Sequence, residues 1–116
     1  MDISNMTYEE LVIERNNILG FNPDNIDECI KVVKRDGFAL RYVKEQTKDI
    51  CMEAVREDGF ALQYVKEQTP DICLEAVRET GLALQYVKEQ TKDICLEAVR
   101  QDINALKYVR DINMLL

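Results

Sequence analysis

The sequence repeats itself at an interval of 22 residues, and this repetition constrains the fold more than any other feature. In its second and third copies the unit reads DICxEAVRxxGxALQYVKEQT. Self-similarity at a fixed spacing of about 20–50 residues is typical of a stacked array in which each unit is one supersecondary element. The interval separates four cysteines and four tyrosines, namely Cys29, Cys51, Cys73, Cys95, Tyr42, Tyr64, Tyr86 and Tyr108.

Other repeat structures have the same period, and the pattern of residues within the unit excludes two of them. A leucine-rich repeat needs leucines at alternating positions followed by asparagine, and this unit has no such strand signature. Two 11-residue repeats would give a right-handed coiled coil, but Gly37, Gly59, Gly81 and Pro70 would interrupt its continuous helices. We therefore predict an all-α, short helical-repeat solenoid with two short helices in each of four repeats.

The repeats divide the chain into two parts. We place the four units at residues 27–48, 49–70, 71–92 and 93–114, within a region that spans 27–116. Residues 1–26 precede them and contain a capping box at 7–10 and a helix stop at Gly20. We expect this segment to form an N-terminal capping helix and a linker. The fourth unit has Ile103 where the others have glycine, and terminal repeats are commonly atypical.

The third unit shows where the two helices of a repeat should begin and end. Thr69 is a natural N-cap, and Pro70 suits the first helical position. We expect a first helix that ends near Glu79, a left-handed Gly81 that closes it, and a second helix over 82–90 before Thr91 caps the next unit. At 100° per residue, each helix has a wide apolar arc, formed by Ile72, Cys73, Leu74, Ala76 and Val77 and by Leu82, Ala83, Leu84, Tyr86 and Val87.

The repeated unit resembles a known family of tandem helical repeats. Its pairs Ala76-Val77, Ala83-Leu84 and Tyr86-Val87, together with Gly81, match the A-V-x-x-x-G-x-A-L-x-Y-V core of domain-of-unknown-function family 4116. The resemblance covers roughly residues 26–109, with Val32 in place of the alanine in the first unit. It implies an all-helical stack and offers no established activity.

Composition excludes several classes of function. The chain has no histidine and a single serine, Ser4, which removes Ser/His and Cys/His catalysis and any metal site that uses imidazole. A formal charge of −7 argues against direct binding to nucleic acid or to an anionic membrane. No apolar run approaches the length of about 18 residues that indicates a membrane span. We expect no enzymatic activity and no cofactor.

The repeated cysteines and tyrosines each have a chemical and a structural interpretation. The thiols offer a metal or redox ladder, but each lies singly within an apolar arc, which favours a small buried side chain and reduced thiols. The tyrosines offer a platform for stacking nucleic-acid bases, but each precedes a valine in the apolar arc of the second helix. We expect them to pack in the core with the hydroxyl at its rim.

The polar faces carry the candidate binding residues. Carboxylate pairs such as Glu75 and Glu79, or Glu53 and Glu57, have the spacing of acid/base or cation sites, but arginines three residues away make them ordinary surface ion pairs. Because the units stack in register, equivalent side chains should form rows that bind a protein partner. The candidate partner-binding residues are Glu53, Arg56, Gln63, Lys66, Glu75, Arg78, Gln85, Lys88, Glu97 and Arg100.

We thus expect a non-enzymatic, protein-binding repeat module that uses its stacked polar helix face. The alternative is an acidic inhibitor or nucleic-acid mimic that blocks a basic nucleic-acid-binding protein, as a viral counter-defence protein would. Self-association through the apolar tail Ile112, Met114, Leu115 and Leu116 is a third hypothesis. Because the sequence opens with no secretion signal, we expect a cytoplasmic location, in a bacterial cell or in the host cytoplasm if the protein is viral.

Overall fold

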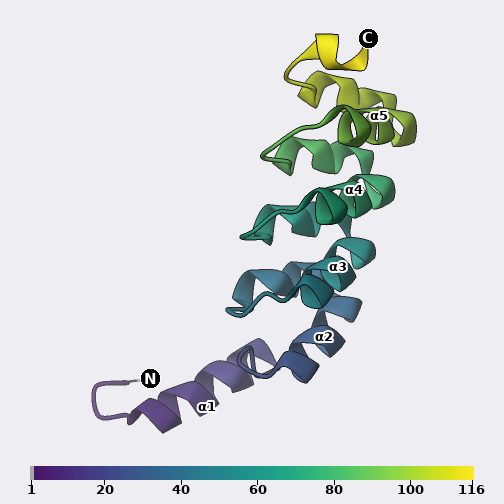
Figure 1. Cartoon of the computed structure of the whole chain (residues 1–116). Coiled ribbons are helices and arrows are strands. Elements are labelled where there is room, and N and C mark those ends of the chain that lie inside the picture. The colour runs from purple at the N-terminus through teal and green to yellow at the C-terminus, as the bar shows by residue number, and fades with distance from the viewer. Residues whose placement is uncertain (1) are drawn as a thin grey trace.

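The computed structural model describes residues 2–116, which form a row of stacked helical units (Figure 1). This part of the chain contains no strand, and its overall dimensions are 61 × 25 × 19 Å. Each unit has an α-helix of ten residues followed by a 3-10 helix of six. The α-helices are α2 (Ile26–Arg35), α3 (Lys48–Glu57), α4 (Pro70–Glu79) and α5 (Lys92–Gln101), and the 3-10 helices are η1 (Gly37–Tyr42), η2 (Gly59–Tyr64), η3 (Gly81–Tyr86) and η4 (Ile103–Tyr108). The predicted all-α stack is confirmed.

Each repeated α-helix begins after a polar residue whose side chain caps it. The hydroxyl of Thr69 accepts a hydrogen bond from the main-chain N–H of Ile72 at 3.3 Å, and Pro70 occupies the first turn, where its missing N–H leaves no bond unmade. Thr91 caps α5 in the same way. These helix starts confirm the prediction, because a capping side chain is a local feature that the sequence contains in full.

The predicted left-handed turn at Gly81 is wrong. Helix α4 ends at Glu79, and Thr80 follows it in an extended conformation with φ of −144°. Within residues 2–116 the only positive φ belongs to Gly20, at 83°, which confirms the predicted stop of the N-terminal helix. The repeated glycines therefore serve a purpose other than left-handed backbone geometry.

The repeated glycines lie where one unit touches the next. A Cβ atom added to Gly37 would stand 2.5 Å from the carbonyl oxygen of Ala54 in α3, and one added to Gly81 would stand 2.5 Å from that of Ala98 in α5. Gly59 is equally crowded by α4. Because real Cβ atoms do not approach an oxygen so closely, glycine allows the close packing of consecutive units. Ile103 holds the equivalent position in the fourth unit, beyond which no further unit is stacked.

The second helix of each unit is a 3-10 helix and is shorter than the predicted 82–90. Helix η3 ends at Tyr86, where the N–H of Val87 donates to the carbonyl of Leu84 at 3.1 Å. Val87 itself is extended and buried. The residues after it carry the chain back across the stack to the next N-cap. Their backbone is held by neighbouring units, so tertiary contacts override local helix propensity.

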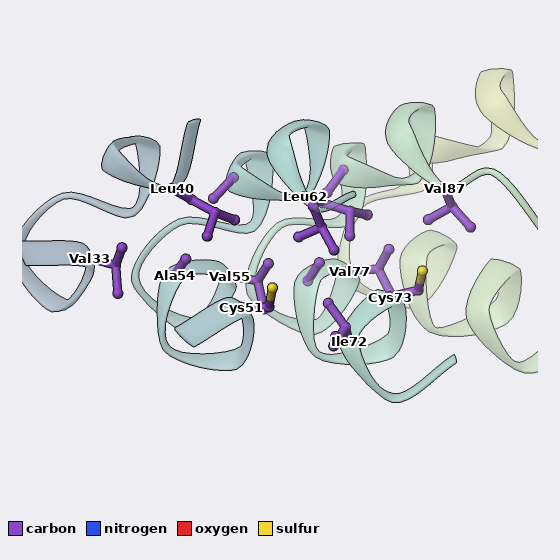
Figure 2. Close-up of a cluster of buried hydrophobic side chains, with 14 of the residues drawn as sticks. Val33, Leu40, Cys51, Ala54, Val55, Leu62, Ile72, Cys73, Val77 and Val87 are labelled. Carbon is purple, nitrogen blue, oxygen red and sulfur yellow. The ribbon is translucent and has the colours of Figure 1, made fainter. Parts of the chain in front are cut away.

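The core lies between the layer of α-helices and the layer of 3-10 helices. Figure 2 shows Val33, Val55 and Val77 on the α-helices and Leu40 and Leu62 on the opposite layer. All five side chains are fully buried. Each repeated α-helix packs against the neighbouring α-helices and against the 3-10 helix of its own unit, and α3, α4 and α5 also pack against the 3-10 helix of the preceding unit. A unit thus buries its apolar side chains largely against other units.

The apolar arc of the first helix is narrower than predicted. Ile72, Cys73, Ala76 and Val77 are buried, whereas Leu74 is half-buried and reaches the surface. The arc predicted for the second helix divides in the same way: Ala83 and Leu84 of η3 and the extended Val87 that follows it are buried, whereas Leu82 and Tyr86 are half-buried. A 3-10 helix has three residues per turn, so it presents a narrower face to the core than the predicted α-helix would.

The N-terminal helix α1 (Tyr8–Leu19) is present but does not cap the stack. Its start is as predicted, since the Thr7 hydroxyl accepts from the N–H of Glu10 at 3.2 Å. None of its residues is buried, and α1 packs against no other helix of the described chain. The first unit is covered instead by Phe21 and Pro23, both buried, with Leu19 half-buried beside them. The predicted cap therefore resides in the linker.

No helix in residues 2–116 is both long enough and apolar enough to cross a membrane.

The chain ends in a short 3-10 helix, η5 (Ile112–Leu115), which packs against α5. Met114 and Leu115 of the predicted apolar tail are half-buried there, whereas Ile112 and Leu116 remain exposed. The tail is thus partly incorporated into the end of the stack.

Thr80 offers a site where one substitution should stabilise the protein. Asp36, Asp58 and Asp102 each cap the following 3-10 helix by accepting a hydrogen bond from the N–H two residues later, whereas Thr80 makes no such bond. We expect Thr80→Asp to raise the free energy of unfolding by about 0.5–1 kcal/mol. Urea unfolding at constant m-value measures it. Asp58→Thr is the reverse control and should lose a similar amount, and an unchanged midpoint in both variants would refute the capping role.

Candidate functional site

The four cysteines lie in the core, one in each unit, and all are free thiols. Burial raises the pKa of each thiol, to about 11 for Cys73, so the thiols keep their protons at neutral pH. Within residues 2–116 no group of three or more His, Cys, Asp or Glu side chains is placed to hold a metal ion. The four cysteines therefore have the environment of small buried apolar side chains and not that of reactive thiolates.

The structure reveals a glutamine ladder that the sequence reasoning missed. The Nε2 atom of Gln68 donates to the carbonyl of Tyr86 at 2.8 Å, and its Oε1 atom accepts from the N–H of Lys88 at 3.0 Å. The same Oε1 atom lies 3.5 Å from Sγ of Cys73, whose S–H donates to it. One amide therefore joins the loop of its own unit to the loop of the next. Gln46 makes the equivalent bonds with Tyr64 and Lys66, and Gln90 with Tyr108 and Arg110.

A signal for the glutamine ladder exists in the sequence. Gln46, Gln68 and Gln90 recur at the period of the repeat in a loop, where solubility alone would accept any polar residue. The fourth unit has Ile112 at this position, and no following loop is stacked against it. An amide is suited to the position because it supplies both a donor and an acceptor. The ladder marks the loop edge as an internal joint rather than a free binding surface.

The tyrosines lie at the outer rim of the 3-10 layer rather than in its centre. Tyr64 packs edge-on against Phe38 at a ring-centroid distance of 5.7 Å, and Tyr86 packs edge-on against Phe60 at 6.1 Å. Both rings are half-buried, whereas Tyr42 is 42% exposed and lies outside the core. The half-buried Tyr108 has the Lys107 amine 5.2 Å from its ring centroid. Neighbouring side chains thus already contact the tyrosine rings on which nucleic-acid bases would have to stack.

Six of the ten candidate partner-binding residues share the solvent side of the α-helices. We call the set of Glu53, Arg56, Glu75, Arg78, Glu97 and Arg100 the α-face row. Within a helix, Arg100 contacts Glu97 at 2.8 Å and Arg78 contacts Glu75 at 3.8 Å. Arg56 contacts Glu53 of its own helix at 3.5 Å and also reaches Glu75 of the next helix at 3.6 Å. The row is therefore connected across α3 and α4.

The other four candidates lie on the 3-10 and loop side. The amides of Gln63 and Gln85 donate to carbonyls of their own helices, those of Phe60 and Leu82, at 3.0 Å each. Lys66 and Lys88 follow the 3-10 helices, and their main-chain N–H groups bind the glutamine ladder. The structure thus separates the ten residues into two surfaces, because the α-helices and the loops belong to different layers (Figure 1).

Two grooves of similar composition run between consecutive α-helices beside the α-face row. The first, between α2 and α3, has a volume of about 450 Å³ and includes Ile30, Met52 and Arg56. The second, between α4 and α5, has a volume of about 270 Å³ and includes Leu74, Leu96 and Arg100. The aliphatic members of these grooves stand at the 22-residue period and are half-buried. We call Ile30, Met52, Leu74 and Leu96 the aliphatic row.

The sequence did not distinguish the aliphatic row from the core, because its members lie within the predicted apolar arcs. Its side chains lie beside charged residues of both signs, with Lys48 and Asp49 at the first groove and Asp93 at the second. The arginine side chains of the α-face row remain half-exposed or more, at 50% for Arg56 and 68% for Arg100. Together the two rows form a surface that combines apolar contact with guanidinium donors.

Comparison with known proteins identifies one family. The family described as Domain of unknown function (DUF4116) matches residues 25–68 and 69–113. The two matched segments adjoin and begin at Asn25 and Thr69, which are the N-caps of α2 and α4. Each segment therefore spans two of the 22-residue units. No curated protein and no solved structure matches the chain.

Proposed function

Because this chain belongs to the domain-of-unknown-function family 4116, whose description assigns no activity, we propose a function from its surface: a non-enzymatic module that binds a protein partner through the α-face. By α-face we mean the α-face row together with the aliphatic row. The observation that carries the proposal is the in-register recurrence of an aliphatic side chain beside an arginine on successive α-helices. Helical solenoids present extended binding surfaces of this kind.

The composition of the α-face supports a protein partner over other ligands. Arginine is enriched at protein interfaces, and its planar group has five donors, of which the intramolecular contacts of Arg100 use only part. Half-buried aliphatic side chains add apolar area that a partner would remove from water. A partner segment with aliphatic side chains and carboxylates fits both features. The protonated thiols and the glutamine ladder stabilise the stack itself, and the proposal gives them no catalytic role.

Charge reversal on the α-face tests the proposal. We expect the triple variant Arg56→Glu, Arg78→Glu, Arg100→Glu to weaken partner binding about 100-fold, because carboxylates replace donors next to the partner's own carboxylates. The partner is first captured from the native host, and affinities are then measured with purified proteins by calorimetry. Circular dichroism verifies that the variant remains helical.

The loop edge offers a matched control at the same period. Lys44, Lys66 and Lys88 recur every 22 residues on the other side of the stack, and the amine of Lys66 makes only an exposed contact with the carbonyl of Lys44. Reversing these three charges should leave the affinity within about threefold of the original. If the lysine variant loses the partner and the arginine variant keeps it, the α-face is rejected as the contact surface.

The alternative of an acidic inhibitor draws on the net charge of −7. It is less well supported, because Glu53, Glu75 and Glu97 are paired with arginines and so form no uninterrupted acidic row. It predicts association with a strongly basic partner that weakens steeply as salt rises. Affinity independent of ionic strength would exclude it. Both proposals place the protein in the cytoplasm, where such partners occur.

A further inference from the structure

Helix α2 carries cations at three positions where α3 and α4 carry two glutamates and one arginine. We call these cations, Lys31, Lys34 and Arg35, the α2 cluster. Their equivalents at the 22-residue period are Glu53, Arg56 and Glu57 in α3, Glu75, Arg78 and Glu79 in α4, and Glu97, Arg100 and Gln101 in α5. Lys31 and Lys34 therefore hold positions that continue the α-face row. The α-face is thus basic on α2 and mixed in charge on the helices that follow.

The cations of the α2 cluster are exposed and unpaired. None of the three takes part in an ion pair in the described chain, residues 2–116. On α3, α4 and α5 each arginine contacts a glutamate three residues earlier, but that position relative to Lys34 is Lys31. In the neighbouring α3, the Glu57 carboxylate accepts a hydrogen bond from the N–H of Gly37 at 2.7 Å. The cluster therefore remains open to an anionic partner.

The stability of α2 does not account for the whole cluster. Cations in the last turn of a helix interact favourably with its dipole, and Lys34 and Arg35 lie in the last turn of α2. The other repeated α-helices have a single cation there, namely Arg56, Arg78 or Arg100. Lys31 lies before the last turn, and it has Lys34 and Arg35 three and four residues away, where like charges repel. The excess of positive charge therefore favours a role in binding.

The spacing of the α2 cluster selects the kind of anion. Residues three and four apart on a helix have Cβ atoms about 5–6 Å apart, so the cations stand side by side on one face. Separate carboxylates along a peptide match this spacing, whereas a single phosphate is best held by the fork of an arginine. A nucleic-acid strand would continue onto α3, where Glu53 and Glu57 would repel its phosphates. The cluster therefore suits a short run of carboxylates.

The aliphatic row determines what should adjoin these carboxylates. Ile30 precedes Lys31 in the chain and lines the groove between α2 and α3 together with Met52. Neighbouring helices lie about 8–10 Å apart, and an extended peptide rises about 3.3 Å per residue, so about three residues cover one unit. A peptide that places its carboxylates on α2 then reaches this groove with its next residues. Figure 1 shows α2, α3, α4 and α5 in one row, which such a peptide would cross in order.

We propose that the partner segment is an acidic peptide whose short run of carboxylates lies on the α2 cluster and whose adjoining aliphatic residues enter the groove of Ile30 and Met52. This inference rests on the proposed function, because it concerns the same α-face, and it adds the chemistry and the register of the partner. A shift by one unit would place the carboxylates beside Glu53 and Glu57. The change of charge between α2 and α3 therefore fixes the register.

Peptides selected from a random displayed library on the full chain test the proposal. We expect the selected peptides to share a run of aspartates or glutamates beside aliphatic residues. Lys31→Glu combined with Arg35→Glu gives α2 the glutamate–cation–glutamate pattern of α3, so the variant should fold, and circular dichroism verifies this. It should weaken the peptides about 30-fold in fluorescence anisotropy. Lys44→Glu combined with Lys66→Glu changes the net charge equally at the loop edge and should keep the affinity within about threefold.

Selected peptides without a carboxylate run overturn the proposal, as does an affinity that the double substitution in α2 leaves unchanged or a library that yields no binding peptide. A single-stranded oligonucleotide of about 16 nucleotides that binds more tightly than the peptides, and is weakened by the same substitutions, also overturns it. Failure of the proposed function looks different, because the peptides then keep their affinity for the triple variant of Arg56, Arg78 and Arg100. Peptides that lose affinity in that triple variant but lack the carboxylate run overturn only the further inference.

Discussion

Replacing Gly59 with alanine is expected to lower the free energy of unfolding by about 3 kcal/mol. The added Cβ atom would overlap the carbonyl oxygen of Ala76 and would stand 2.7 Å from Cβ of Thr80. Both obstacles are parts of the next unit, so relief requires units two and three to separate at the middle of the stack. Urea unfolding followed by circular dichroism measures the loss, and a broadened transition would accompany it if the two halves uncouple.

The sign of this effect is informative. An alanine that fits its site stabilises a protein relative to glycine by about 0.4–1 kcal/mol, because it restricts the unfolded chain. A gain in stability at position 59 would therefore show that the close approach between units does not exist. The matched control is Ile103→Ala at the equivalent position of the fourth unit, where the side chain is 67% exposed. It should change stability by no more than about 0.5 kcal/mol.

The second large effect is expected at Gln68. Replacement by leucine leaves an apolar side chain that is one atom shorter, and it removes the bonds to Tyr86 and Lys88 and the acceptor for the Cys73 thiol. We expect a loss of about 2–3 kcal/mol, because the half-buried carbonyl of Tyr86 is left without a partner. The midpoint of urea unfolding measures it, with thermal unfolding as a second measurement.

Gln85 supplies the control for the glutamine ladder. Its amide donates at 3.0 Å to the carbonyl of Leu82 in the same 3-10 helix, and within residues 2–116 it forms no hydrogen bond to another unit. Gln85→Leu should therefore cost about 0.5–1 kcal/mol, the value of one ordinary hydrogen bond. Equal losses from Gln68→Leu and Gln85→Leu would show that the ladder does not join the units. Ile112, at the ladder position of the fourth unit, should accept glutamine without a gain in stability.

The candidate surface could be predicted from the sequence only in part. The row of glutamates and arginines follows from helical spacing and the 22-residue period, because both are local. The aliphatic row did not follow, since Leu74 satisfies the same hydrophobic pattern as Val77 and only packing shows that one is half-buried and the other buried. Assignment of Gln63 and Lys66 to the same surface as Arg56 failed to anticipate that helices and loops occupy separate layers.

The sequence by itself determined the number of units, the start of each α-helix and the inward position of the cysteines, because period, capping side chains and apolar spacing are contained within a few neighbouring residues. The tertiary structure decided why Gly59 and Gln68 are needed and where α1 lies. Gly59 and Gln68 are needed because they contact another unit, about 20 residues away along the chain. Helix α1 is exposed because no unit packs beside it. Glycine at position 59 is equally consistent with a left-handed turn and with a close approach until the carbonyl of Ala76 is placed next to it. Local chemistry sets what each unit is, and the contacts between units set which of its residues the stack requires.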